Sequence, residues 1–291
     1  MGLLLIARFT FQEVIRRRLF LAVLLLSALI VGAFALLFGE VISQVGGSNG
    51  QGIDPQVFLL GIGVFLDVAA IWLVYLLSSL LTIVMAAGMI SSEVDAGTFA
   101  VIVPKPLARA EIVFGKWSGY ALILGVYTAF LFLAFLAVVY WLTGYWPSQT
   151  FSALGMLELG MLALLALTTL GSAFVPTIVN GAIALMLFIG APIASIVQFI
   201  IQFASPANLQ TVQNITTVIN LVMPTDALWH GTSYYLLPPA TAFAAMGQST
   251  SGLNTPFTSA QPVAWTLVVW VMLYCIALPV VAAVRFQHRD L

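Results

Sequence analysis

Long runs of uncharged, apolar residues separate the few charged residues of this chain, and their length is its most constraining feature. Of 291 residues, 62% are hydrophobic and only 7% are charged, a composition far outside that of soluble domains. A helix needs about 20 residues to cross the hydrocarbon core of a bilayer. The sequence therefore predicts an all-α polytopic membrane protein, with a single transmembrane domain over residues 1–291. The six predicted spans are about 19–39, 68–90, 117–143, 152–175, 181–203 and 263–284.

The basic residues predict the orientation of these spans. Of the nine Lys and Arg residues, four precede the first span, three lie between the second and third, and two follow the sixth. Because bases concentrate in cytoplasmic loops, we expect a cell (inner) membrane protein with both termini in the cytoplasm. In residues 1–18, Arg8, Gln12 and Arg16 recur every four residues. This spacing favours an interfacial helix on anionic head groups, and a simple basic anchor is the alternative.

The stretch 91–116, between the second and third spans, holds six ionisable residues in a chain otherwise nearly free of charge. Ser92 and Asp95 have the Ser-x-x-acid spacing of a helix start. Phe99, Ile102 and Val103 then share one helix face, and a Pro-Lys-Pro motif ends the helix. We therefore predict a short cytoplasmic helix with an apolar knob, against the alternative of a plain surface loop. The ionisable residues are Glu93, Asp95, Lys105, Arg109, Glu111 and Lys116.

This stretch resembles the membrane subunits of ATP-binding-cassette exporters of the type-2 permease class. The resemblance rests on an acid, a Gly-Thr pair, a Lys-Pro pair, an arginine and a Gly-Lys pair in the family's order, here Glu93, Gly97-Thr98, Lys105-Pro106, Arg109 and Gly115-Lys116. It implies that the segment is a coupling helix that docks on a separate cytoplasmic ATPase. The implied partner-binding residues are Glu93, Asp95, Gly97, Thr98, Phe99, Ile102, Val103, Lys105, Pro106 and Arg109.

The ATPase is expected to be another polypeptide, because the chain lacks a phosphate-binding Gly-x-x-x-x-Gly-Lys-[Ser/Thr] loop and Gly115-Lys116 is followed by Trp117. The resemblance implies two ATPase copies, carrying ATP and Mg²⁺, with two membrane subunits. The second membrane subunit is expected to be an identical copy, with a different one left open. No cofactor, catalytic residue or nucleic-acid partner is expected for this chain, which would contact membrane lipids.

The outer segment 204–262 is too long for a simple connection. Leu209, Val212, Ile215, Val218, Ile219 and Val222 form an apolar stripe, which predicts an amphipathic helix in or near the outer interface. By resemblance, interfacial or re-entrant helices here would cap the exit of the pathway, whereas an ordinary interfacial cover is the alternative. The possible gate residues are Ile215, Ile219, Met223, Pro224 and Asp226.

Two acids, Asp67 and Glu158, stand near the predicted outer ends of the second and fourth spans. Acids inside a membrane are functional candidates by default, but we expect both to reach the head groups as solvated boundary residues. A cation or substrate role is the alternative. His230 and His288 fall on opposite sides of the predicted topology, and no metal site is expected. The single cysteine, Cys275, excludes a disulfide within the chain.

Two other classes of protein could present six apolar helices. A gradient-driven secondary transporter or channel would tend to show internal repeats, interrupted helices or buried ionisable groups, and only Gly190-Ala191-Pro192 interrupts a predicted span. A membrane-embedded enzyme would need a catalytic cluster, and the sequence suggests none. The substrate stays open, because an apolar lining suits lipids, drugs, peptides or small ions.

Overall fold

The computed structural model describes residues 10, 18–47, 55–91, 109–204, 209–238 and 255–287. Within these residues, six helices are long and apolar enough to cross a membrane, which confirms the all-helical prediction with six spans. They are α2 (Arg18–Gly47), α3 (Pro55–Ala86), α6 (Arg109–Thr143), α7 (Thr150–Phe174), α8 (Thr177–Ala204) and α12 (Trp265–Gln287). Two shorter helices, α9 (Leu209–Val222) and α10 (Thr225–Leu236), precede α12.

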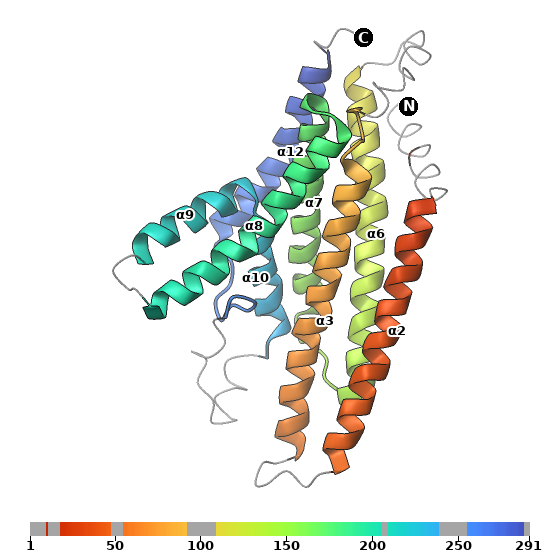
Figure 1. Ribbon diagram of the computed structural model, residues 1–291, viewed down its shortest axis with the longest axis vertical. Helices are drawn as coiled ribbons and strands as arrows, with labels where there is room; N and C mark the ends of the chain where they lie inside the picture. Colours follow the sequence, from red (N-terminus) through yellow and green to blue (C-terminus); the bar gives the residue numbers. More distant parts are fainter. Residues whose placement is uncertain are drawn as a thin grey trace.

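The centre of the bundle is built from α3, α6 and α7. α3 packs along α6, and α7 packs against α10 and α12. In Figure 1, α2, α3 and α6 run along the long axis of the molecule. The hydroxyl groups of Ser27 on α2 and Tyr127 on α6 share a buried hydrogen bond of 2.7 Å, and Phe34 meets Phe135 edge-on. Polar and aromatic contacts of this kind hold helices together where lipid weakens the hydrophobic driving force.

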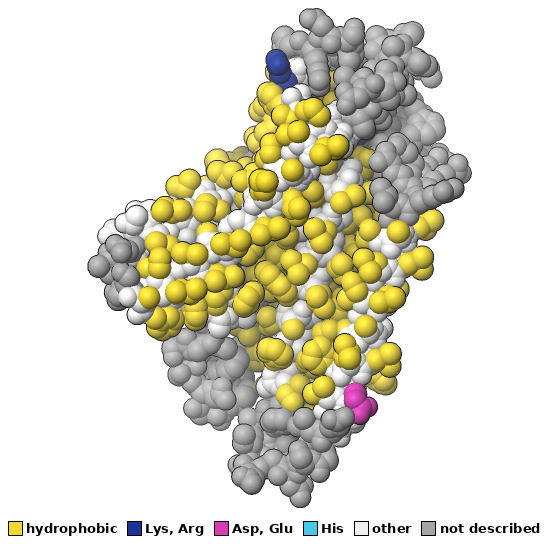
Figure 2. Space-filling model, viewed as in Figure 1, with side chains coloured by type: hydrophobic (Ala, Val, Ile, Leu, Met, Phe, Trp, Pro, Cys, Tyr) yellow, Lys and Arg dark blue, Asp and Glu magenta, His cyan; other side chains and the backbone are white. Residues whose placement is uncertain are grey.

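α8 leaves the bundle obliquely, and α9 returns beside it, so that the two helices project as an arm (Figure 1). Among the described side chains visible in Figure 2, hydrophobic ones predominate, and the charged ones lie near the two ends of the molecule. On the two helices of this arm, the apolar side chain of Phe203 in α8 is 72% exposed and that of Ile215 in α9 is 54% exposed. Apolar side chains left open in this way suit a surface that contacts lipid.

Three helices extend beyond the predicted limits because charge was taken to mark a span boundary. α2 continues past residue 39 through Glu40 to Gly47. α3 begins at Pro55 rather than near residue 68, and Asp67 lies inside it. α6 begins at Arg109 rather than near residue 117, so that Glu111 and Lys116 form part of its first turns. A helix satisfies its own backbone hydrogen bonds, and it therefore continues through a charged residue whenever packing accommodates the side chain.

The lower end of α6 is fixed by a tight turn. Gly144 adopts φ +71° and donates its N–H to the carbonyl of Tyr140, which is the left-handed helix cap that glycine favours. Around this turn stand three exposed aromatic residues, Tyr140, Trp141 and Trp146, and Trp141 is 77% exposed. Such residues gather where a membrane meets water, so this turn marks one bilayer surface.

Candidate functional site

A set of polar contacts at the upper end of Figure 1, here called the upper junction, holds the turn that follows α3. The Lys116 ammonium of α6 donates to the Met89 carbonyl at 3.1 Å. The Asn180 side-chain amide of α8 donates to the carbonyls of Ala87 and Thr168, each at 2.8 Å. The Met89 and Ala87 carbonyls lie in the turn that ends α3, where backbone carbonyls lack partners within the helix, and the Thr168 carbonyl belongs to α7. Three different spans therefore meet at the residues that lead into segment 92–108.

The upper junction also includes the first turn of α8. The hydroxyl groups of Ser91 and Thr177 lie 2.9 Å apart in a hydrogen bond. On α7, Gly171 leaves room for Asn180, because a Cβ at Gly171 would overlap the Asn180 Oδ1. The last described residue before segment 92–108 is thus bonded directly to the start of α8, and a displacement of one would move the other.

The predicted ATPase-binding residues fall almost wholly outside the described residues. Arg109 is the first residue of α6, and together with Ser91 at the end of α3 it bounds the segment. The end of α3 and the start of α6 both lie toward the upper end of the bundle (Figure 1). The residues outside the described part are Glu93, Asp95, Gly97, Thr98, Phe99, Ile102, Val103, Lys105 and Pro106.

A cavity of about 610 Å³ lies between α8, α9, α10 and the segment 255–264, and is here called the α9 cavity. Its size falls within the range of small-molecule pockets. In the described part of the chain, no Lys, Arg, Asp or Glu lines the cavity, and uncharged polar side chains dominate the lining. Those polar residues are Ser195, Gln198, Gln202, Gln213, Thr216, Asn220, His230, Thr255, Thr258, Ser259 and Gln261.

The polar face of α9 supplies one wall of this cavity. Gln213, Thr216 and Asn220 line it, while Ile215 on the opposite face points outward. Thr216 is only 5% exposed, and neither its hydroxyl nor the Asn220 Oδ1 has a hydrogen-bond partner among the described residues. Buried polar atoms normally have partners. Two such atoms beside one cavity indicate groups available to a ligand.

Asp226, at the start of α10, lies behind the cavity wall. Its Oδ2 accepts a hydrogen bond from Ser195 of α8, and the His230 Nδ1 is 2.9 Å from its backbone carbonyl and 3.6 Å from Oδ2. Asp226 lies outside the six candidate spans. Burial raises the pKa of its carboxyl group above the usual range, while His230 and the Ser195 hydrogen bond act in the opposite direction. This contact joins α8 to α10.

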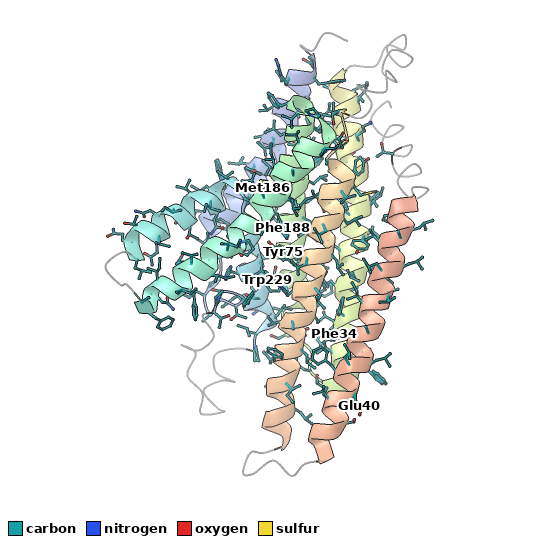
Figure 3. The ribbon with its side chains drawn as sticks, in the orientation of Figure 1. Phe34, Glu40, Tyr75, Met186, Phe188 and Trp229 are labelled. Atoms are coloured by element: carbon teal, nitrogen blue, oxygen red, sulfur yellow. The ribbon has the colours of Figure 1, made fainter. Side chains whose placement is uncertain are left out.

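Aromatic residues anchor α10 to α3. Trp229 packs against Trp72 and Tyr75 with ring centroids 4.9 and 5.4 Å apart, and its Nε1 donates to the Phe257 carbonyl. Figure 3 shows Tyr75 and Trp229 close together, with Phe188 of α8 beside them. Offset and edge-on pairs of this kind add to the apolar area that they bury. These contacts hold α10, whose Ala227 and His230 line the α9 cavity.

α9 is held at its last turn by α12. The Trp270 Nε1 donates to the Leu221 carbonyl at 3.1 Å, and the Tyr274 hydroxyl donates to the Val222 carbonyl at 2.6 Å. These two bonds satisfy carbonyls that every helix leaves open at its C-terminus. They also fix the rotation of α9, so that its polar face turns toward the cavity.

The structure divides the predicted gate residues into two groups. Met223 and Asp226 are buried, and Pro224 caps the start of α10. Ile215 faces outward, and Ile219 is half-buried against the core. Sequence reasoning missed the cavity and most of its lining, above all Thr216 and His230. The available signal was the polar face of α9, where Gln213, Thr216 and Asn220 follow helical spacing.

The expected solvated boundary position is wrong for Asp67, which is 0% exposed within α3, with neither carboxyl oxygen hydrogen-bonded among the described residues. Glu158 of α7 is half-buried, with its Oε1 also unpartnered there, and Gly125 of α6 lies against its carboxyl group. Both acids lie within candidate spans. Helix packing encloses Asp67, because α3 begins at Pro55 and carries this residue well inside the helix.

The sequence matches the model of a known protein family. The model of a family described as "ABC-2 family transporter protein" matches residues 4–291. No curated protein matches the chain significantly. The match spans almost the entire sequence and agrees with six long apolar helices. The chain therefore belongs to the ABC-2 family of transporter proteins, as a multi-pass membrane subunit of the permease type.

Proposed function

We propose that this chain forms the substrate pathway of an exporter and couples it to ATP hydrolysis by a separate nucleotide-binding subunit. The observation that carries the proposal is the upper junction, where the end of α3 is bonded to α6 and α8 through Met89, Ala87 and Ser91. A partner that pushes segment 92–108 would act on these helices together. The family match supports the presence of an ATPase partner.

α8 offers a route for such a displacement. It begins at the upper junction with Thr177 and Asn180 and meets Asp226 through Ser195 beside the α9 cavity. Pro192 lies between these contacts and removes one backbone hydrogen bond, so a bend there is easier than elsewhere in α8. In this proposal, motion at the coupling segment changes the α9 cavity through α8.

The proposed assembly contains two ATPase subunits, which carry ATP and Mg²⁺, and two copies of this chain. Purification in mild detergent after co-expression with the ATPase tests it. We expect a complex of both polypeptides whose transport activity stops when the ATPase is omitted or its catalytic site is inactivated. An intact dimer of this chain alone, active without any ATPase, would overturn the proposal.

The proposed location is the cell (inner) membrane, with both termini and segment 92–108 in the cytoplasm. In a variant lacking Cys275, cysteines introduced at Gly50 and Thr250 should react with an impermeant thiol reagent in intact cells. A cysteine at Ala108 should react only after the cells are opened, because it lies within the stretch that holds Lys105, Arg109 and Lys116. Labelling at Ala108 in intact cells would reverse the orientation.

A gradient-driven transporter remains the second candidate because of Asp67 and Glu158. Unpartnered carboxyl groups inside spans are typical of proton or cation pathways, and both acids meet that description. The two candidates differ in their response to an ionophore that collapses ion gradients. An ATP-driven exporter in vesicles would continue to transport, whereas a gradient-driven transporter would stop.

A further inference from the structure

We propose that the α9 cavity is a binding site for an uncharged, hydroxyl-rich head group, of the chemistry shared by saccharides and glycolipids. This inference concerns ligand binding at equilibrium, which requires no ATPase. It therefore goes beyond the proposed ATP-driven export. It rests on the chemistry of the lining, on two buried polar atoms without partners, and on the apolar surface beside the cavity.

The lining selects against ionic ligands. A phosphate or sulfate group is normally held by Arg, Lys or converging backbone N–H groups, and no Lys or Arg is among the described residues that line the cavity. A cationic ligand would need an accessible carboxylate, but Asp226 is fully buried and already accepts from Ser195. An uncharged polar ligand avoids both requirements.

The side chains present suit vicinal hydroxyl groups. Gln198, Gln202 and Gln213 line the cavity, and each primary amide offers two donors and one acceptor oxygen. A hydroxyl group likewise donates and accepts, so a ring of hydroxyls can pair with several amides at once. Thr216 and Asn220 supply the unpartnered hydroxyl and amide oxygen already described. The cavity would thereby satisfy polar atoms that the protein leaves open.

Apolar side chains adjoin the same cavity. Phe199 lines it and contacts Phe203 with ring centroids 5.2 Å apart, and Phe203 points away from the protein. A ring face such as that of Phe199 can also cover the apolar face of a sugar. A ligand with its head group in the cavity could therefore extend a lipid tail along α8, whereas a free saccharide would use the cavity alone.

The test uses the full chain in phosphatidylcholine nanodiscs, prepared without glycosidic detergents because their sugar head groups would compete. Three probes distinguish an uncharged head group from an anionic one, and a soluble ligand from a lipid. They are radiolabelled maltotriose, discs containing glucosyl diacylglycerol, and discs containing phosphatidylglycerol. Equilibrium dialysis measures the saccharide, and native mass spectrometry measures the bound lipid. We expect saturable binding of a glycosylated probe and no enrichment of phosphatidylglycerol.

Two matched double variants on α9 locate the site. Thr216→Val with Gln213→Leu removes two polar groups from the cavity, and should weaken binding roughly tenfold or more. Thr217→Val with Gln210→Leu makes the same chemical changes at exposed positions outside the lining, and should change the affinity by less than about twofold. The near-isosteric Thr216→Val alone should also weaken binding, without a large change in packing.

The outcomes decide both the chemistry and the source. Binding of maltotriose supports the proposal with a soluble ligand, and binding of glucosyl diacylglycerol alone supports it with a lipid. Absence of saturable binding to either, preferential binding of phosphatidylglycerol, or an equal loss in the two double variants would overturn it. Because no ATPase is present, failure here leaves the proposed export function to its own test.

Discussion

Truncating Phe99 to alanine should weaken binding of this chain to its ATPase subunit about thirtyfold. Phe99 is the largest apolar residue of the predicted coupling helix, and Ile102 and Val103 follow it on the same face. An aromatic anchor in a desolvated partner pocket contributes on the order of 2 kcal/mol or more. The measurement is the fraction of ATPase that co-purifies with the variant across a range of ATPase concentrations.

A substitution of Glu93, at the start of the predicted coupling helix, should have a different effect from Phe99→Ala. Reversing the charge with Glu93→Lys alters a polar contact at the predicted rim, where charge fixes orientation more than affinity. We expect a complex that assembles and hydrolyses ATP but transports poorly. Thr217→Val, on the exposed face of α9, serves as a control. If Phe99→Ala and Glu93→Lys both assembled and transported like the parent, residues 92–108 would have no coupling role, as expected for a plain surface loop.

Replacing Asp67 with leucine should stabilise the protein by about 3 kcal/mol, since an unpaired buried carboxyl group costs several kcal/mol. Asp67 is fully buried in α3, and its oxygens have no hydrogen-bond partner among the described residues. Leucine branches at Cγ as aspartate does, so the packing changes little. Thermal unfolding of the purified chain in detergent measures the change.

Two variants of Asp67 together distinguish a carboxyl group that serves transport from one that only lowers the stability of the protein. Asp67→Asn preserves the shape and polarity but removes the ionisable group, and its stability should lie between the parent and Asp67→Leu. If the acid serves transport, both variants lose transport while keeping or gaining stability, as functional sites often exchange stability for activity. A lower unfolding temperature for Asp67→Leu would show that the carboxyl group has a stabilising partner in the membrane.

The six spans could be predicted because hydropathy and helix length alone decide which segments cross a bilayer. The start of α3 could not, since the sequence does not reveal that helix packing would enclose Asp67. The amphipathic character of α9 could also be predicted, because its apolar residues recur with the period of a helix. The direction of its polar face was not, because it depends on Trp270 and Tyr274, far along the chain on α12.

The α9 cavity illustrates the same limit. Its lining comes from α8, α9, α10 and residues 255–264, and no local pattern joins these four segments. Ser195 and Asp226 are 31 residues apart in the sequence, with the whole of α9 between them, yet they share a hydrogen bond beside the cavity. The predicted coupling residues from Glu93 to Pro106 stay a prediction, since they lie outside the described residues.

The length of α6 has a consequence for where a cytoplasmic partner stands. Its 35 residues extend about 52 Å as a helix, whereas the hydrocarbon core is about 30 Å thick. With Trp141 at one bilayer surface, Trp117 lies about 36 Å away along the helix, close to the opposite surface. In the proposed orientation, the turns from Arg109 to Lys116 then rise about 12 Å beyond that surface. In that orientation, the start of α6 lies beyond the lipid head groups, where an ATPase could dock on the proposed coupling segment without touching the membrane.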